Sequence, residues 1–246
     1  MGTGWLVGRD VMITNNHVID TVARAKQLRA EFNYQLNEDG SPATADLFGF
    51  DPDGFFYTNA ALDFTLVKVK CKPWVINLPL RVERTEDGHF MVLDEAAAGP
   101  VGPDGVVTPL NVGPIGLTPP VYKFCTSAGS RWGNLQLPTS GVVYADEQHV
   151  NIVQHPKGRR KEVAVQQNQI SGLFPTRVRY TTDTEPGSSG SPVFDNQWDL
   201  MAIHHAGGEY SDGRWKNNQG VRIDKIVADL QANHAAGSWV RNQLGI

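Results

Sequence analysis

Three side chains of this 246-residue chain, far apart in the sequence, have the types that acyl transfer to a nucleophile requires: His17, Asp63 and Ser189. A serine hydroxyl is a weak nucleophile, so it needs a base that takes its proton while it attacks. Histidine suits that task because its pKa lies near neutrality. A carboxylate then fixes the tautomer of the imidazole and stabilises the imidazolium ion that forms. These residue types therefore satisfy the chemistry of serine hydrolysis.

Each of the three side chains stands beside a short apolar segment. His17 comes just past Val11–Thr14, and Asp63 stands at the head of an alternating apolar segment. Ser189 lies in the loop Gly187-Ser188-Ser189-Gly190, where glycines leave room for backbone N–H groups to turn toward a developing oxyanion. Taken singly, each is an ordinary turn residue. Their joint occurrence favours a catalytic role.

The elements that must position these side chains are short and rich in β-branched and aromatic residues. Clusters of Gly, Pro, Asn and Asp separate them, and the chain holds 25 glycines and 15 prolines. The predicted strands are Trp5–Gly8, Val11–Thr14, Ala30–Leu36, Phe64–Lys70, Val150–Gln154, Glu162–Gln166, Arg177–Thr182, Ser191–Phe194 and Leu200–His204. The spacing of apolar residues from Ile223 predicts one amphipathic helix. Many short strands with one helix favour an all-β sandwich or barrel.

The segments that carry the three side chains resemble the motifs of the trypsin-like serine peptidases. Ile13-Thr14-Asn15-Asn16-His17-Val18 is similar to the histidine box of that family, and Leu62-Asp63-Phe64-Thr65-Leu66-Val67 is similar to its aspartate strand. Gly187-Ser188-Ser189-Gly190-Ser191-Pro192-Val193 is similar to its nucleophile loop. The strand Ile203–Gly208 and the segment Val153–Gly158 resemble the bacterial branch that includes the glutamyl endopeptidases.

This resemblance implies an all-β fold of two β-barrels with a C-terminal α-helix, in a single trypsin-like peptidase domain that takes up the whole chain. We expect the N-terminal barrel over residues 1–71, the C-terminal barrel over 149–222 and the helix over 223–246. Residues 72–148 are interpreted as the connection between the barrels, with a long insertion rich in Gly and Pro.

By the same resemblance, Ser189 is the nucleophile, His17 is the general base and then the acid, and Asp63 is the carboxylate that orients the base. The backbone N–H groups of Gly187 and Ser189 form the oxyanion hole. A peptide substrate is expected to bind as an added antiparallel strand. The residues expected along that strand are His205, Ala206 and Gly207.

Two interpretations of the specificity pocket stay open. Asp183, six residues before Ser189, matches the base of the pocket, where a carboxylate favours an arginine or lysine side chain of the substrate. Thr184 and His204 match the positions that bind the substrate carboxylate in glutamyl endopeptidases, and a protonated His204 would cancel the charge of Asp183. We favour basic substrates because an unpaired carboxylate would repel an acidic side chain.

Composition excludes several other classes of protein. The net charge of −4 argues against a nucleic-acid binder. No apolar run reaches the roughly 18 residues that span a membrane, and no secretory signal is visible. With only Cys71 and Cys125, we expect free thiols and a cytoplasmic location. The neighbours His204 and His205 face opposite ways on a strand, so we expect no metal, and no cofactor.

The predicted function is that of a regulated serine endopeptidase of bacterial type, with protein or peptide substrates and no nucleic-acid or membrane partner. A regulatory partner, a fused domain and the long insertion stay open as means of control. One alternative is a catalytically inactive pseudoprotease that binds peptides in the same cleft. Another is an esterase or transacylase. Reaction of Ser189 with a fluorophosphonate separates an enzyme from a pseudoprotease.

Overall fold

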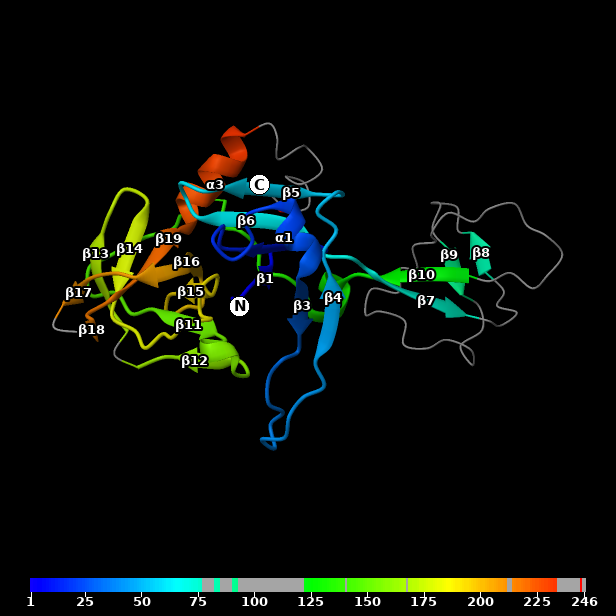
Figure 1. Cartoon of the computed structure of the whole chain (residues 1–246), viewed down its shortest axis with the longest axis horizontal. Helices are drawn as coiled ribbons and strands as arrows, with labels where there is room; N and C mark the ends of the chain where they lie inside the picture. Colours follow the sequence, from blue (N-terminus) through cyan, green and yellow to red (C-terminus); the bar gives the residue numbers. More distant parts are fainter. Residues whose placement is uncertain are drawn as a thin grey trace.

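Figure 1 shows the computed structural model, which describes residues 1–76, 82–84, 90–92, 122–139, 141–166, 168–211, 214–233 and 244. Its strands fall into two main groups, one from each half of the chain. Helix α3 (Ile223–Ala232) lies between these groups and packs on strands of the second. Each of these two groups of strands carries part of the predicted site.

The first sheet is antiparallel and brings distant segments together. Its strand order is β1 (Trp5–Leu6), β2 (Val11–Thr14), β6 (Phe64–Lys68) and β5 (Phe56–Asn59). Helix α1 (Val22–Gln27) and the hairpin of β3 (Arg29–Phe32) and β4 (Asp46–Gly49) share a buried cluster with it. In the β2–β6 pair, Thr14 lies opposite Thr65. The residues that follow β2 and those that precede β6 therefore meet at one end of the sheet, and His17 and Asp63 are among them.

The second sheet has seven antiparallel strands from the C-terminal half. Their order is β12 (Glu162–Ala164), β11 (Asn151–Gln154), β15 (Pro192–Phe194), β16 (Leu200–Gly207), β19 (Asn218–Arg222), β14 (Arg177–Tyr180) and β13 (Ile170–Leu173). The central strand β16 pairs with β15 as far as Ile203 and with β19 as far as Gly207. Its last residues therefore extend beyond β15.

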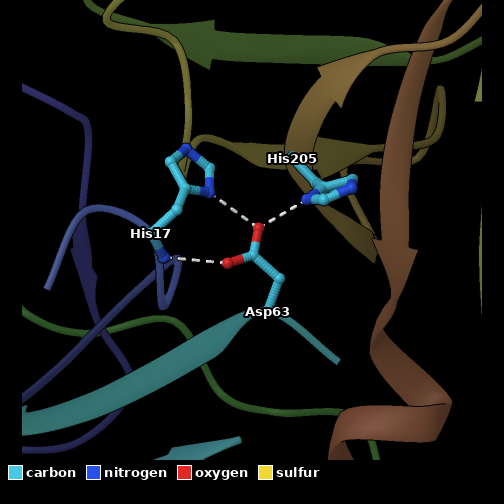
Figure 2. A group of neighbouring side chains, drawn as sticks. All are labelled: His17, Asp63 and His205. Carbon is cyan, nitrogen blue, oxygen red and sulfur yellow. Dashed lines mark hydrogen bonds and ion pairs between the residues drawn. The ribbon is translucent and has the colours of Figure 1, made fainter. Parts of the chain in front are cut away.

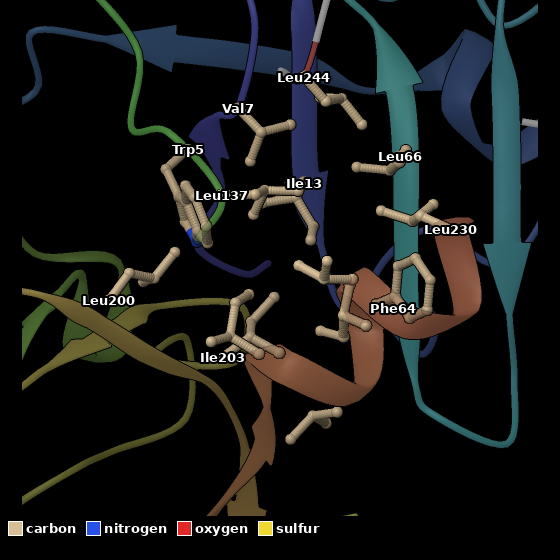
Figure 3. Close-up of a cluster of buried hydrophobic side chains, with 14 of the residues drawn as sticks. Trp5, Val7, Ile13, Phe64, Leu66, Leu137, Leu200, Ile203, Leu230 and Leu244 are labelled. Atoms are coloured by element: carbon tan, nitrogen blue, oxygen red, sulfur yellow. The ribbon is translucent and has the colours of Figure 1, made fainter. Parts of the chain in front are cut away.

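Buried apolar side chains form one cluster in each half and a third that joins the halves. The joint cluster includes Trp5, Val7, Ile13, Phe64, Leu66, Leu200, Ile203 and Leu230 (Figure 3). The four apolar residues of α3 that the sequence places on one face are all buried: Ile223, Ile226, Val227 and Leu230. Burying each such side chain contributes roughly 1.5–3 kcal/mol relative to exposure. Helix α3 therefore helps to fix the two halves against each other.

The all-β class with a C-terminal helix is confirmed, and every predicted strand overlaps an observed one. The sequence does not predict β19, because Asn-Gln-Gly-Val-Arg lacks alternation and the strand forms through pairing with β16 and β14. Of the helix expected over 223–246, the structure shows α3 over Ile223–Ala232, and residues 234–243, 245 and 246 lie outside the described residues. Asn233 is already extended, because the apolar repeat that docks the helix stops at Leu230.

Strands β7 (Lys72–Ile76) and β10 (Tyr122–Thr126) pair in an arm that projects away from the two sheets in Figure 1. A disulfide joins Cys71 to Cys125 at the base of this arm, with Cα atoms 5.5 Å apart. The expectation of free thiols is therefore wrong. The pairing of β7 with β10 brings together two residues whose separation along the chain gives no sign of contact.

The remaining short elements are β8 (Val82–Arg84), β9 (Phe90–Val92), α2 (Ala128–Trp132), the 3-10 turn Pro156–Gly158, β17 (Tyr210–Ser211) and β18 (Arg214–Trp215). The Gly- and Pro-rich part of the predicted insertion, residues 95–119, lies outside the described residues. No helix within the described ranges is long and apolar enough to cross a membrane.

Candidate active site

Two hydrogen bonds to one carboxylate fix His17 in the turn after β2. Its backbone N–H donates to Oδ1 of Asp63 at 2.9 Å, and its Nδ1 lies 2.8 Å from Oδ2 (Figure 2). The buried Asn15 donates to the carbonyl of Asp63 at 2.9 Å, which ties the two turns together. The side chain of His17 is 47% exposed. Because an ionised carboxylate only accepts hydrogen bonds, Nδ1 carries a proton, and in the neutral form of the ring the lone pair is then on Nε2.

Asp63 lies in the turn before β6, with a φ of +51° that aspartate tolerates better than most side chains. Its side chain is buried, with 9% exposed. Burial alone would raise the pKa of this carboxyl group. Hydrogen bonds from the His17 and His205 rings and from the His17 amide outweigh burial and hold the pKa well below its usual range. Asp63 is therefore ionised at neutral pH.

His205 is the third member of this cluster and comes from β16 in the other half of the chain. Its Nδ1 lies 2.5 Å from Oδ2 of Asp63, the oxygen that His17 also contacts (Figure 2). The sequence predicts His205 only as part of the substrate strand and misses this contact. The alternation of side chains along a strand is the one signal that could find it, because it turns His205 away from the buried face that holds His204.

The cluster has the residue types of a metal site, with two imidazoles and one carboxylate whose ligand atoms all lie within 4.8 Å of one another. The contacts of 2.5 and 2.8 Å between Nδ1 atoms and Oδ2 are hydrogen-bond distances. A metal ion would have to replace the protons on both Nδ1 atoms. We therefore interpret the cluster as hydrogen-bonded, and the absence of a metal stays a prediction.

The loop that carries Ser189 makes a tight turn in which Gly187 and Gly190 have φ values of 106° and 91°. A side chain on Gly187 would come within 2.8 Å of the His155 carbonyl, and one on Gly190 would overlap the Thr3 carbonyl. Both positions therefore require glycine. Among the described residues, nothing accepts a hydrogen bond from the backbone N–H of Gly187 or Ser189. These two donors are of the kind that an oxyanion hole needs.

Residues 2–5, which we call the N-terminal strap, hold this loop in place. The N–H of Thr3 donates to the Ser189 carbonyl at 2.7 Å, and its hydroxyl donates to the Gly187 carbonyl at 2.9 Å. The indole N–H of Trp5 donates to the Gly190 carbonyl at 3.1 Å. Sequence reasoning misses this support, because the segment carries no catalytic signature.

His17 and Ser189 lie on neighbouring loops. Gly2 stands between them, since a Cβ there would lie 2.7 Å from the Val18 side chain and 3.3 Å from the Ser189 carbonyl. In the part of the chain that the structure describes, no hydrogen bond joins the Ser189 hydroxyl to the His17 ring. The structure thus joins His17 to Asp63 directly and places the loop of Ser189 close to them. Catalytic hydrogen bonds often tighten only when substrate binds.

The predicted pocket residues Asp183 and Thr184 both lie near Asn218 of β19. The exposed Asp183 lines a hollow of about 310 Å³ together with Thr182 and Asn218. The hydroxyl of Thr184 donates to Oδ1 of Asn218 at 2.7 Å, and Nδ2 of Asn218 donates to the Thr182 carbonyl at 2.5 Å. The hollow is therefore lined by neutral polar groups together with two charged side chains, Asp183 and Lys216.

His204 is buried on the opposite face of β16 from His205. Its Nδ1 lies 2.9 Å from the hydroxyl of Tyr180, a buried residue that the sequence does not single out. Burial, and then the neighbouring rings of His205 and His17, lower the pKa of His204 to about 3. His204 is therefore neutral near pH 7. The idea that a protonated His204 cancels the charge of Asp183 is not supported.

The predicted substrate strand has an open edge. Ala206 and Gly207 pair with Gln219 and Asn218 of β19, while the pairing of β16 with β15 ends at Ile203. Among the described strands, none pairs with the other side of β16 at these positions. An extended peptide could add there as a new strand.

A family model described as the trypsin-like peptidase domain matches residues 2–203. The chain is 27% identical to the uncharacterized protein y4fB of Sinorhizobium fredii over 280 aligned positions, which cover 99% of this chain and 35% of that protein. It is 28% identical to secreted RxLR effector protein 73 of Plasmopara viticola over 247 positions, which cover 93% of this chain and 45% of that protein. The chain thus spans less than half the length of these curated relatives.

The family match covers most of the chain and includes both the His17–Asp63 pair and the loop of Ser189. It does not distinguish the branches of the family, so the glutamyl endopeptidase branch stays a prediction. The match agrees with the all-β fold of two strand groups and a C-terminal helix. The chain belongs to the trypsin-like peptidase domain family.

Proposed function

We propose that the protein is a serine endopeptidase that hydrolyses peptide bonds through His17, Asp63 and Ser189. The observation that carries this proposal is the pair of hydrogen bonds from His17 to the ionised Asp63, beside a serine loop shaped by two glycines. The pair orients the imidazole and selects the tautomer in which Nε2 is the free nitrogen, as a general base requires.

The reaction would proceed in two acyl-transfer steps. Nε2 of His17 takes the proton of the Ser189 hydroxyl while Oγ attacks the substrate carbonyl, and the oxyanion is stabilised by the N–H groups of Gly187 and Ser189. His17 then gives the proton to the leaving amine as the C–N bond breaks. Water, deprotonated by His17, attacks the acyl-enzyme and releases the carboxylic acid and Ser189. Asp63 stays ionised throughout.

The substrate would bind as an extended strand along the open edge of His205, Ala206 and Gly207. Asp183 supports a preference for arginine or lysine side chains in the pocket, because the neutral His204 does not offset its carboxylate. Lys216 lines the same hollow and supports the opposite preference, for acidic side chains. Thr184 would contribute to the polar wall of that pocket. Profiling cleavage sites on a peptide library tests this preference, and cleavage after acidic residues would contradict it.

The setting of the domain is also a proposal. Relatives more than twice as long as the matched region support the idea that a fused domain or partner controls the peptidase. A cytoplasmic location loses one of its arguments, since Cys71 and Cys125 are paired and disulfides persist mainly in oxidising compartments. Fractionation of cells followed by immunodetection of the protein tests the cytoplasmic location, and recovery in an oxidising compartment would contradict it.

The test of the proposed function is reaction of Ser189 with a fluorophosphonate probe, together with turnover of peptide substrates. We expect Ser189→Ala to abolish both while the thermal unfolding midpoint stays unchanged. Ser188→Ala is the matched control, since this buried neighbour lies in the same loop and is expected to keep labelling. If the native chain binds peptides but neither cleaves them nor reacts with the probe, it is a pseudoprotease. If esters but not peptides are turned over, it is an esterase.

A further inference from the structure

One oxygen of Asp63 serves two imidazoles. Oδ2 lies 2.8 Å from Nδ1 of His17 and 2.5 Å from Nδ1 of His205, while Oδ1 accepts the His17 amide (Figure 2). The two rings are 6.2 Å apart and inclined at 66°. An ionised carboxylate has no proton to donate, so both Nδ1 atoms carry hydrogen. Oδ2 therefore receives two N–H donors from opposite halves of the chain.

We propose that His205 is a positioning residue that holds Asp63 in place and limits the negative charge that Asp63 presents to His17. This inference rests on the proposed function, in which His17 is the base. Asp63 sits in a left-handed turn of the N-terminal half, and β16 belongs to the C-terminal half. The contact from His205 thus fixes the carboxylate relative to the strand along which the substrate would bind.

The electrostatic part of the proposal follows from the shared oxygen. The carboxylate of Asp63 attracts the positive charge that His17 gains when it takes a proton from the serine, and a second N–H donor on Oδ2 weakens that attraction. Among the described residues, His204 on the same strand and Arg177 of β14 also interact electrostatically with members of this cluster. His204 is neutral and Arg177 stays charged over the working range of pH.

The test compares two replacements of His205. His205→Leu removes the donor, whereas His205→Asn keeps an N–H donor near the position of Nδ1 without a titrating ring. We expect kcat of the leucine variant to fall roughly tenfold to a hundredfold with KM little changed, since hydrogen bonds to charged groups are of that strength. The acid limb of the profile of kcat/KM against pH should move to higher pH, because Asp63 then acts on His17 alone. The asparagine variant should retain most of kcat and show a smaller movement.

His149→Ser is the control, because it removes an exposed histidine outside the cluster and should change neither quantity. Equal kcat and equal acid limbs in the native, leucine and asparagine proteins would overturn the proposal. Equal impairment of both variants would show a packing role only. Thermal unfolding checks that each variant folds, and His205→Ala replaces the leucine variant if that one does not.

A separate measurement distinguishes failure of this inference from failure of the proposed function. If the native protein does not react with a fluorophosphonate, the proposed function fails. The imidazole of His17 can still be titrated by NMR in the Ser189→Ala protein, with and without His205→Leu. We expect the midpoint to rise when the leucine is present, and an unchanged midpoint would contradict a shared carboxylate.

Discussion

The two sides of the candidate active site are held by different forces. On the histidine side, the buried and ionised Asp63 gathers N–H donors from His17 and His205. On the serine side, the carbonyls of the loop accept hydrogen bonds from neutral groups of Thr3 and Trp5. Hydrogen bonds to an ion are about twice as strong as those between neutral groups. The base is therefore oriented by a charge, whereas the nucleophile depends on backbone geometry.

The largest expected decrease in kcat comes from removing the charge of Asp63 on the histidine side of the site. Asp63→Asn removes the ion and presents an amide that cannot accept equally from both imidazoles, so His17 loses its orientation and its preferred tautomer. We expect kcat to fall by about 10⁴, as when the carboxylate of such a triad is replaced by an amide. Steady-state kinetics on a peptide substrate measures this. Asp53→Asn, at an exposed residue paired with Lys26, is the control and should keep full activity.

Lowering the pH should first reduce the stability that depends on the buried, neutral His204 on the serine side of the site. The pKa of His204 is about 3 in the folded state and about 6.5 when unfolded, so the unfolded chain binds the extra proton. The free energy of unfolding should therefore fall by about 1.4 kcal/mol per pH unit below pH 6.5, down to about pH 3. The pKa of Asp63 is depressed, so its contribution is lost only below the usual carboxylate range.

Denaturant unfolding at several pH values measures this effect. The control is His204→Gln, which keeps a hydrogen-bonding partner for Tyr180 and should flatten the dependence above pH 4. A dependence that persists in the glutamine variant would assign the acid sensitivity to another group.

Tyr180→Phe tests the support of the serine side. The hydroxyl of Tyr180 contacts the ring of His204, and the carbonyl of His204 accepts a hydrogen bond from the Gly190 amide at 2.8 Å. Removing the hydroxyl leaves Nδ1 of His204 buried without this partner, at a cost of about 1–3 kcal/mol. Thermal unfolding should show the loss. Tyr34→Phe, at a tyrosine that stacks on His155 away from β16, is the control. An unfolding midpoint equal to that of the native protein would show that the Tyr180–His204 contact contributes little.

The smallest effect is expected from the N-terminal strap. Thr3→Val removes the hydroxyl that donates to the Gly187 carbonyl but keeps the backbone bond to Ser189. One neutral hydrogen bond contributes about 0.5–1.5 kcal/mol, so kcat should fall a few-fold to about tenfold. Thr44→Val, an exposed threonine in the turn before β4, should have no effect. A decrease in kcat as large as that of Asp63→Asn would contradict this ranking and show that the strap contributes as much to kcat as the carboxylate does.

The amino-acid sequence predicts the class of the fold, which is confirmed, and it provides the candidate catalytic residues, which remain a prediction. Alternating and β-branched segments predict strands such as β2, and the spacing of Ile223, Ile226 and Leu230 predicts the buried face of α3. The motifs of His17 and Asp63 belong to turns next to these strands. Such local patterns survive in a sequence because each element must present its own apolar face.

Which groups contact one another depends on how the strands are assembled in three dimensions. The second donor on Asp63, the neutral state of His204 and the Cys71–Cys125 pair all depend on strands that are distant in the chain. Strand β19 likewise exists because two neighbours pair with it, not because its residues favour a strand. Burial and hydrogen-bond partners are properties of the assembled sheets. These properties determine that His204 is neutral, and the local sequence around His204 does not encode them.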